Sequence, residues 1–94
     1  MRVDKFLKVS RLVKRRTVAR EACEEGRVAV NGRKAKPGSE VSVGDIVAIE
    51  FGGGTVQVQV LEVRDSATAD IARRMYRVVE GPVRGISPAD EHTY

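Results

Sequence analysis

The sequence has few of the residues that build redox, metal or base-stacking sites. It contains one cysteine, one histidine and no tryptophan in 94 residues, and aromatic side chains make up 4% of the chain. The single cysteine, Cys23, has no partner for an internal disulfide, and no Cys/His group has the spacing of metal ligands. Few aromatic residues are available to stack single-stranded bases. We therefore expect no metal site, no cofactor and no base-stacking groove.

Long apolar runs are also missing. Asp4, Lys5 and Lys8 interrupt the N-terminal segment, which therefore lacks the apolar stretch of about 7–15 residues that a secretory signal needs. No run approaches the roughly 20 apolar residues of a membrane span. These absences predict a cytoplasmic protein without a membrane partner.

The length favours a single domain with a surface function. A chain of 94 residues can bury one core but has little spare volume for an enclosed substrate cavity. Hydrophobic residues make up 41% and charged residues 32%, which is typical of a globular, well-solvated chain. We expect one domain over residues 1–80, with no catalytic function, and a flexible C-terminal tail over 81–94, where prolines and glycines follow no period.

Hydrophobic spacing predicts two helices before the first strand. Over residues 3–13, Val3, Phe6 and Leu7 recur at helical spacing. Thr17 is a candidate N-cap for a second helix, and Gly26 is its candidate C-cap. The apolar face of this second helix is predicted to consist of Val18, Ala19, Ala22 and Cys23.

After Gly26 the period changes to two, which is typical of strands. Residues 28–30 form the first predicted strand, and the Asn31-Gly32 pair predicts a two-residue hairpin turn because both residues tolerate positive φ. The remaining predicted elements are strands over 46–51 and 56–60, a helix over 68–76 with Ile71, Met75 and Tyr76 on its inner side, and an edge strand over 78–79.

This order of elements predicts an α+β fold in which short paired helices pack on a small antiparallel sheet. In the strand over 56–60, alternation places three valines inward and two glutamines outward. Gly26, Gly32 and Gly44 are expected to serve backbone geometry. The expected core consists of Val3, Phe6, Leu7, Val18, Ala22, Val28, Val30, Val47 and Ile49.

Positive charge is concentrated at the N-terminal end. Residues 1–36 hold twelve Lys or Arg against four Asp or Glu, whereas the rest of the chain has a net charge of −4. Such a cluster is either a solvated face that keeps the domain soluble or a surface for a polyanion, whose phosphates release counterions when they are neutralised. Helical spacing favours the second interpretation, because Lys5 and Lys8, and likewise Arg16 and Arg20, project from one side of their helices. The first set of candidate RNA-binding residues is Arg2, Lys5, Lys8, Arg11, Lys14, Arg15, Arg16 and Arg20.

Catalytic interpretations have weaker support. His92 lies in the expected tail, and Cys23 lies on an apolar helix face where a thiol acts as a small hydrophobe. Glu24 follows Arg20 by four residues and is expected to form a helix-surface ion pair with it. The glycines at 52–54 lack the Lys-Ser/Thr ending of a phosphate loop and predict a hairpin loop instead.

Three stretches together carry a resemblance to a known family: residues 2–7 (RVDKFL), 15–20 (RRTVAR) and 26–32 (GRVAVNG). Their order and spacing resemble the S-four (alpha-L) RNA-binding domain, and 36–37 (KP) with 43–47 (VGDIV) extend the match, so that the core motif covers residues 2–50. The resemblance implies an RNA-binding surface on the paired helices and the adjoining hairpin. On the hairpin, the candidate RNA-binding residues are Asn31, Arg33, Lys34 and Lys36.

Within that family, residues 9–17 and the Met75-Tyr76 pair are similar to the stand-alone proteins of the RqcP group and, more broadly, to the heat-shock protein fifteen group. This resemblance implies a monomeric, non-catalytic factor of bacterial ribosome quality control that supports alanine tailing. The implied partners are large-subunit ribosomal RNA, tRNA and the dissociated large ribosomal subunit with its stalled nascent chain. Two alternatives remain open: a module for another structured RNA, and a protein-interaction adaptor whose basic face meets an acidic partner.

Overall fold

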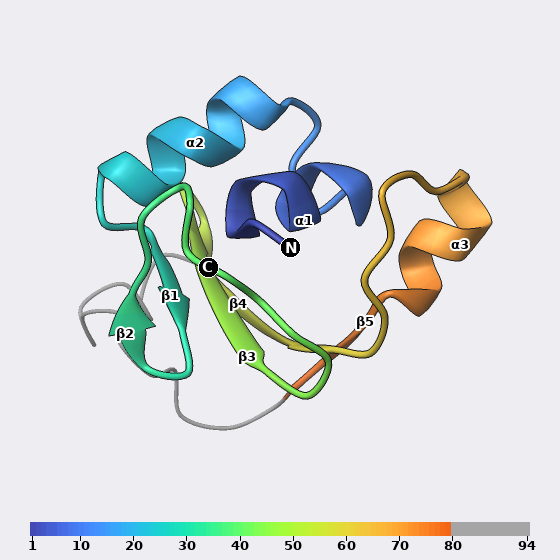
Figure 1. Ribbon diagram of the computed structural model, residues 1–94. Helices are drawn as coiled ribbons and strands as arrows, with labels where there is room; N and C mark the ends of the chain where they lie inside the picture. Colours follow the sequence, from blue (N-terminus) through green and yellow to red (C-terminus); the bar gives the residue numbers. More distant parts are fainter. Residues whose placement is uncertain (80–94) are drawn as a thin grey trace.

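A computed structural model describes residues 1–79, in which helices cover one face of an antiparallel sheet (Figure 1). The strand order is β2-β1-β3-β4-β5, and each neighbouring pair is antiparallel. The elements are α1 (Val3–Val9), α2 (Arg16–Glu24), β1 (Val28–Val30), β2 (Arg33–Lys34), β3 (Ile46–Phe51), β4 (Gly54–Val60), α3 (Ala69–Arg74) and β5 (Tyr76–Val78). The predicted α+β class, with paired helices on a small antiparallel sheet, is confirmed.

Helix α1 is shorter than predicted. It ends at Val9 instead of continuing to residue 13, because Arg11 adopts a left-handed conformation with φ of +62°. The chain then turns back, so that the Val13 amide donates to the Leu7 carbonyl at 3.0 Å and Val13 is buried. Arg11 thus takes the place after the helix end where glycine is usual, and it directs the following residues toward α2.

Helix α2 begins one residue before the predicted cap. Arg15 occupies the N-cap position without a side-chain hydrogen bond, so the prediction of Thr17 as N-cap is wrong. The helix ends as predicted: Gly26 has φ of +76°, and the Arg27 amide donates to the Ala22 carbonyl at 2.9 Å, as in a Schellman motif.

Val18 does not join the core. Its exposed fraction is 45%, whereas Ala19, Ala22 and Cys23 are buried. At about 100° per residue, Val18 lies roughly a quarter turn from the centre of the stripe that these three residues form. Its assignment to the core is therefore wrong, although the rest of the apolar face of α2 is confirmed.

The first hairpin has the predicted turn. Asn31 and Gly32 have φ of +51° and +83°, as a type I′ turn requires. The hairpin pairs Val30 with Arg33, and on its other side β1 pairs with β3 so that Val28 lies opposite Ile49. This register turns Val28, Val47 and Ile49 toward the helices, whereas Ala29 and Ala48 pair on the opposite face.

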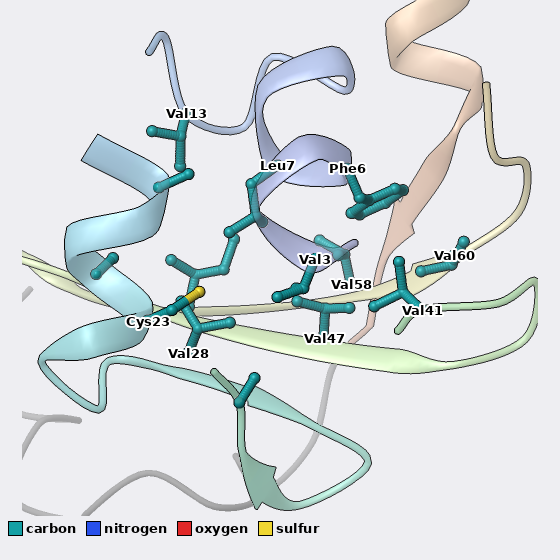
Figure 2. Packing of buried hydrophobic residues seen from close by; sticks show 14 of the residues in the cluster. Val3, Phe6, Leu7, Val13, Cys23, Val28, Val41, Val47, Val58 and Val60 are labelled. Carbon is teal, nitrogen blue, oxygen red and sulfur yellow. The ribbon is translucent and has the colours of Figure 1, made fainter. Parts of the chain in front are cut away.

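The core lies between the sheet and the two N-terminal helices (Figure 2). Phe6 and Leu7 of α1 point down onto Val28, Val47 and Val58 of the sheet. Nearly all the predicted core residues are buried, except that Val18 is exposed and Val30 is half-buried. Val58, Val60 and Met75 are buried, which confirms that they face inward, and Val13 and Val41 are buried as well.

The second hairpin contains the two predicted strands, but one of the two glutamine side chains of β4 is not exposed as predicted. Gln57 and Gln59 alternate with the valines of β4, yet Gln57 has an exposed fraction of only 7%. It lies opposite Ala48, and β4 is an interior strand with β3 and β5 on its two sides. The expectation that both glutamines face solvent is therefore wrong for Gln57.

The third helix is also shorter than predicted. Thr68 caps α3, its hydroxyl accepting from the Ile71 amide at 3.3 Å, and the helix ends at Arg74. Met75 is fully buried beyond the helix end, and Tyr76 belongs to the edge strand β5 instead of the helix. The expected tail over 81–94, including His92, lies outside the described residues.

Candidate RNA interface

The first set of candidate residues lies on α1, on α2 and on the loop between them. Lys5 is half-buried. The other seven members are exposed, with fractions of 51% for Arg2, 46% for Arg16 and 65% for Arg20. These side chains therefore keep their charged heads in solvent, and α1 packs against α2, so the two helices present their cations together.

A buried carboxylate, Asp4, organises the centre of this surface. Asp4 has an exposed fraction of 2% and accepts from Arg2 through both oxygens, with distances of 3.2 Å to Nε and 3.2 Å to Nη2. Its Oδ1 also accepts from Arg16 Nη2 at 3.4 Å and from the Lys5 amide at 2.8 Å. One acid therefore ties an arginine before α1 to an arginine at the start of α2.

Asp4 is not among the candidates predicted from sequence, although the sequence carries a signal for it. Asp4 is the lone acidic residue within the cationic stretch of residues 2–20. A carboxylate in the first turn of a helix is favoured by the helix dipole, and two arginines can share one buried acid because its two oxygens offer several acceptor positions. A single acid among many cations in the sequence therefore indicates a residue that forms ion pairs with its basic neighbours in the fold.

Two open hollows flank Arg16. The first, of about 270 Å³, is lined mainly by Lys5, Lys8, Arg11 and Arg16 on one side and by residues 65–67 on the other. The second, of about 320 Å³, is lined by Arg2, Asp4, Arg16, Thr17 and Arg20. Because Arg16 lines both hollows, they form a continuous cationic surface over α1 and α2. Lys14 and Arg15 are exposed on the loop that leads into α2 and line neither hollow.

Some cations of this surface have acidic partners that remain in solvent. Arg20 Nε lies 3.6 Å from Glu24 Oε2, which confirms the expected ion pair along α2. Lys5 Nζ donates to Asp65 Oδ1 at 2.8 Å, and this hydrogen bond and the Lys5 charge lower the pKa of the Asp65 carboxyl. Exposed pairs of this kind contribute little to stability, so both cations remain available to another anion.

The hairpin residues are exposed, but they differ in their surroundings. The Asn31 amide is engaged within the fold: its Nδ2 donates to Asp45 Oδ1 at 3.1 Å and its Oδ1 accepts from the Ile46 amide at 2.9 Å. Lys34 reaches Gly26 at the C-terminal end of α2, where a cation is favoured. Arg33 lies on the edge strand β2.

Lys36 lies in the connection between β2 and β3, which packs beside the start of α1. The Lys36 amide donates to Ser39 Oγ at 2.9 Å, and the Ser39 carbonyl accepts from the Val3 amide at 2.7 Å. The Arg2 guanidinium lies beside Gly38 in the same loop. The structure therefore brings the loop of Lys36 next to Arg2, whereas Arg33 and Lys34 extend from the outer strand.

The described residues contain no arrangement of side chains that suits a reactive cysteine, a metal site or a phosphate loop. Cys23 is buried, and burial, followed by the charges of Asp4 and Glu24, raises the pKa of its thiol to about 11. Residues 1–79 contain no group of side chains placed to hold a metal ion and no helix long and apolar enough to cross a membrane. Gly52 and Gly53 form the predicted hairpin loop between β3 and β4, whereas Gly54 is the first residue of β4 and pairs with Phe51.

Comparisons with known proteins agree with this fold. The family model of the S4 domain matches residues 1–47, and the chain belongs to the S4 domain family. It is 48% identical over 80 residues to the RQC P-site tRNA stabilizing factor of Bacillus subtilis, a match that covers 85% of this chain and 93% of that protein. The factor of the same name from Streptococcus pneumoniae is 48% identical over 79 residues, or 84% of this chain and 90% of that protein.

A solved structure shows the same fold in a more distant relative. The heat shock protein 15 of Vibrio cholerae, solved as a trimer, is 31% identical and superposes with a TM-score of 0.79. The match covers 84% of this chain and 81% of that one. The resemblance to the RqcP and heat-shock protein fifteen groups is confirmed.

Proposed function

We propose that this protein is a non-catalytic RNA-binding factor that stabilises P-site tRNA on large ribosomal subunits holding a stalled nascent chain. The observation that carries the proposal is the continuous cationic surface of α1 and α2 around the buried Asp4. Relatives that are about 48% identical over most of their length are named RQC P-site tRNA stabilizing factor. We further propose that the chain also contacts large-subunit ribosomal RNA, acts as a cytoplasmic monomer and supports alanine tailing.

The chemistry of this surface suits an RNA backbone. Arginine can bind a phosphate through two parallel hydrogen bonds, and an exposed lysine can follow as a point charge. Arg2 and Arg16 are fixed by Asp4 yet remain about half exposed, so each can bind a phosphate without first being ordered. The proposed contact residues are the candidates predicted from sequence on α1, α2 and the hairpin, with residues 1–80 as the binding domain.

Hairpin residues are assigned unequal roles in this proposal. Arg33, Lys34 and Lys36 extend the cationic surface from β2 and from the loop beside Arg2. The side-chain amide of Asn31 already bonds Asp45 and Ile46, so an RNA contact of Asn31 is expected to be the weakest of the set.

The salt dependence of tRNA binding tests the proposal. Replacing Arg15 and Arg16 with alanine should weaken binding and reduce the slope of log affinity against log salt by about 0.7–0.9 for each phosphate that the variant no longer neutralises. The matched control is the double substitution Arg73→Ala and Arg74→Ala, which removes the same charge from exposed positions on α3. Equal slopes for the two double variants would contradict the proposed surface.

A further inference from the structure

The hollow beside α1 has an outer wall that lies beyond the matched S4 domain. The family model covers residues 1–47, whereas Asp65, Ser66 and Ala67 belong to the connection between β4 and α3. This connection is attached to α1 by two contacts. Lys5 donates to Asp65 at 2.8 Å, and Arg11 Nη2 donates to the Ala67 carbonyl at 3.4 Å.

The two acids that face this cationic surface differ in how firmly they are held. Asp4 has an exposed fraction of 2% and binds two arginines, so its negative charge is a fixed part of the fold. Asp65 has an exposed fraction of 93% and contacts one lysine. Its carboxylate can move into water at little cost, because an exposed ion pair gains little over the solvated charges.

The Asp65 carboxylate resembles a phosphate group in its contact with Lys5. Both are anionic acceptors for an ammonium group, and the hollow behind the pair is lined by three further cations: Lys8, Arg11 and Arg16. The Asp65 carboxylate bonds Lys5, and Arg16 is already paired with Asp4. A phosphate has more oxygens than a carboxylate and can meet several cations at once.

We propose that Asp65 is a removable counter-ion, which an RNA phosphate displaces from Lys5 when it enters the hollow formed by α1 and residues 65–67. The phosphate is then bound by Lys5, Arg11 and Arg16, and the Ser66 hydroxyl lies on the same wall. This inference rests on the proposed RNA-binding function. It adds that residues 65–67, in the connection between β4 and α3, influence the affinity for RNA. Asp65 thus weakens RNA binding, because its contact with Lys5 has to be broken before a phosphate can enter the hollow.

The test measures tRNA affinity of the full chain at near-physiological salt. Asp65→Asn should bind about two- to five-fold more tightly than the unaltered chain, because Lys5 no longer has to be released. Asp70→Asn is the matched control: it makes the same change of charge at an exposed residue of α3 that does not line the hollow. It should change affinity less than Asp65→Asn, because Asp70 does not line the hollow and a phosphate that enters the hollow does not have to displace it.

A double-mutant cycle separates the ion pair from net charge. In a Lys5→Gln background, Asp65→Asn should give no gain, because the lysine that it releases is absent. A gain of equal size in that background, or equal effects of Asp65→Asn and Asp70→Asn, would overturn the counter-ion role while leaving RNA binding intact. Failure of the unaltered chain to bind tRNA would instead overturn the proposed function, and this inference with it.

Discussion

Replacing Asp4 with asparagine tests whether the buried carboxylate holds the two N-terminal helices together. Asparagine has nearly the same shape, and its single oxygen can still accept from the Lys5 amide. It has no charge, and its NH₂ group is a donor that faces the donors of Arg2 and Arg16. The substitution therefore removes the ion pairs while leaving the packing volume unchanged.

The expected loss of stability is about 1.5–3 kcal/mol, the usual contribution of hydrogen bonds to a charged group. A larger loss, of about 3–5 kcal/mol, applies where the remaining charge stays buried without a partner. That case does not arise here, because Arg2 and Arg16 are about half exposed and can be rehydrated. For a domain of this size, the expected loss lowers Tm by about 6–24 °C.

Urea unfolding followed by circular dichroism measures this change. The midpoint should fall while the slope with denaturant stays constant, since the surface exposed on unfolding is the same. Asp65→Asn is the control, because it removes the same charge from an exposed residue and should leave the midpoint unchanged. If Asp4→Asn unfolds at the same urea concentration as this control, Asp4 does not organise the helices.

Three further predictions concern the fold. Gly44→Ala should destabilise by about 1–2 kcal/mol through backbone strain alone, because Gly44 has φ of +96° with open space around it; an unchanged urea midpoint would contradict this. Val18→Ser should change stability by less than about 0.5 kcal/mol, whereas Val28→Ala should cost about 1–3 kcal/mol in the same assay, since Val18 is exposed and Val28 is fully buried; similar losses would refute the assignment of faces on α2. Cys23, with its pKa raised to about 11, should react slowly with a thiol reagent at pH 8 until urea unfolds the chain. Because the thiol ionises first in the unfolded state, stability should fall as pH rises from about 9 to 11, and Cys23→Ala should remove that part of the pH dependence.

Local sequence signals predicted the elements whose geometry depends on neighbouring residues. The Asn31-Gly32 turn follows from two residues that tolerate positive φ, and both have it. The strand Ile46–Phe51 and the helix end at Gly26 also follow from short patterns. Each of these features is set by contacts within a few residues, so the sequence carries the necessary information.

Other features depend on contacts between distant residues. The left-handed Arg11 that ends α1 has no sequence signature, because arginine has no preference for that conformation. Val41 is buried within the core cluster, although it lies on no periodic face. Gln57 is covered through its central position in the sheet. These positions are decided by tertiary packing.

The candidate RNA interface also combines features that local sequence predicts with features that depend on contacts between distant residues. The cationic residues of α1 and α2 could be assigned from charge and helical spacing, because these depend on sequence alone. The contact of Asp4 with Arg16 spans twelve residues and that of Lys5 with Asp65 spans sixty. Neither pairing can be read from local spacing. The sequence marks Asp4 as the lone acid of residues 2–20, but the fold decides that Arg16 is its partner and that Asp65 is the partner of Lys5.

Crosslinking and sequencing of the RNAs bound in cells tests the central claim most directly, with the Arg15→Ala and Arg16→Ala double variant beside the unaltered chain. We predict that the unaltered chain crosslinks to tRNA and large-subunit ribosomal RNA, and that the double variant loses both. Enrichment of a single noncoding RNA would contradict the ribosomal function, and the absence of any bound RNA would leave the cationic surface as a solvated face.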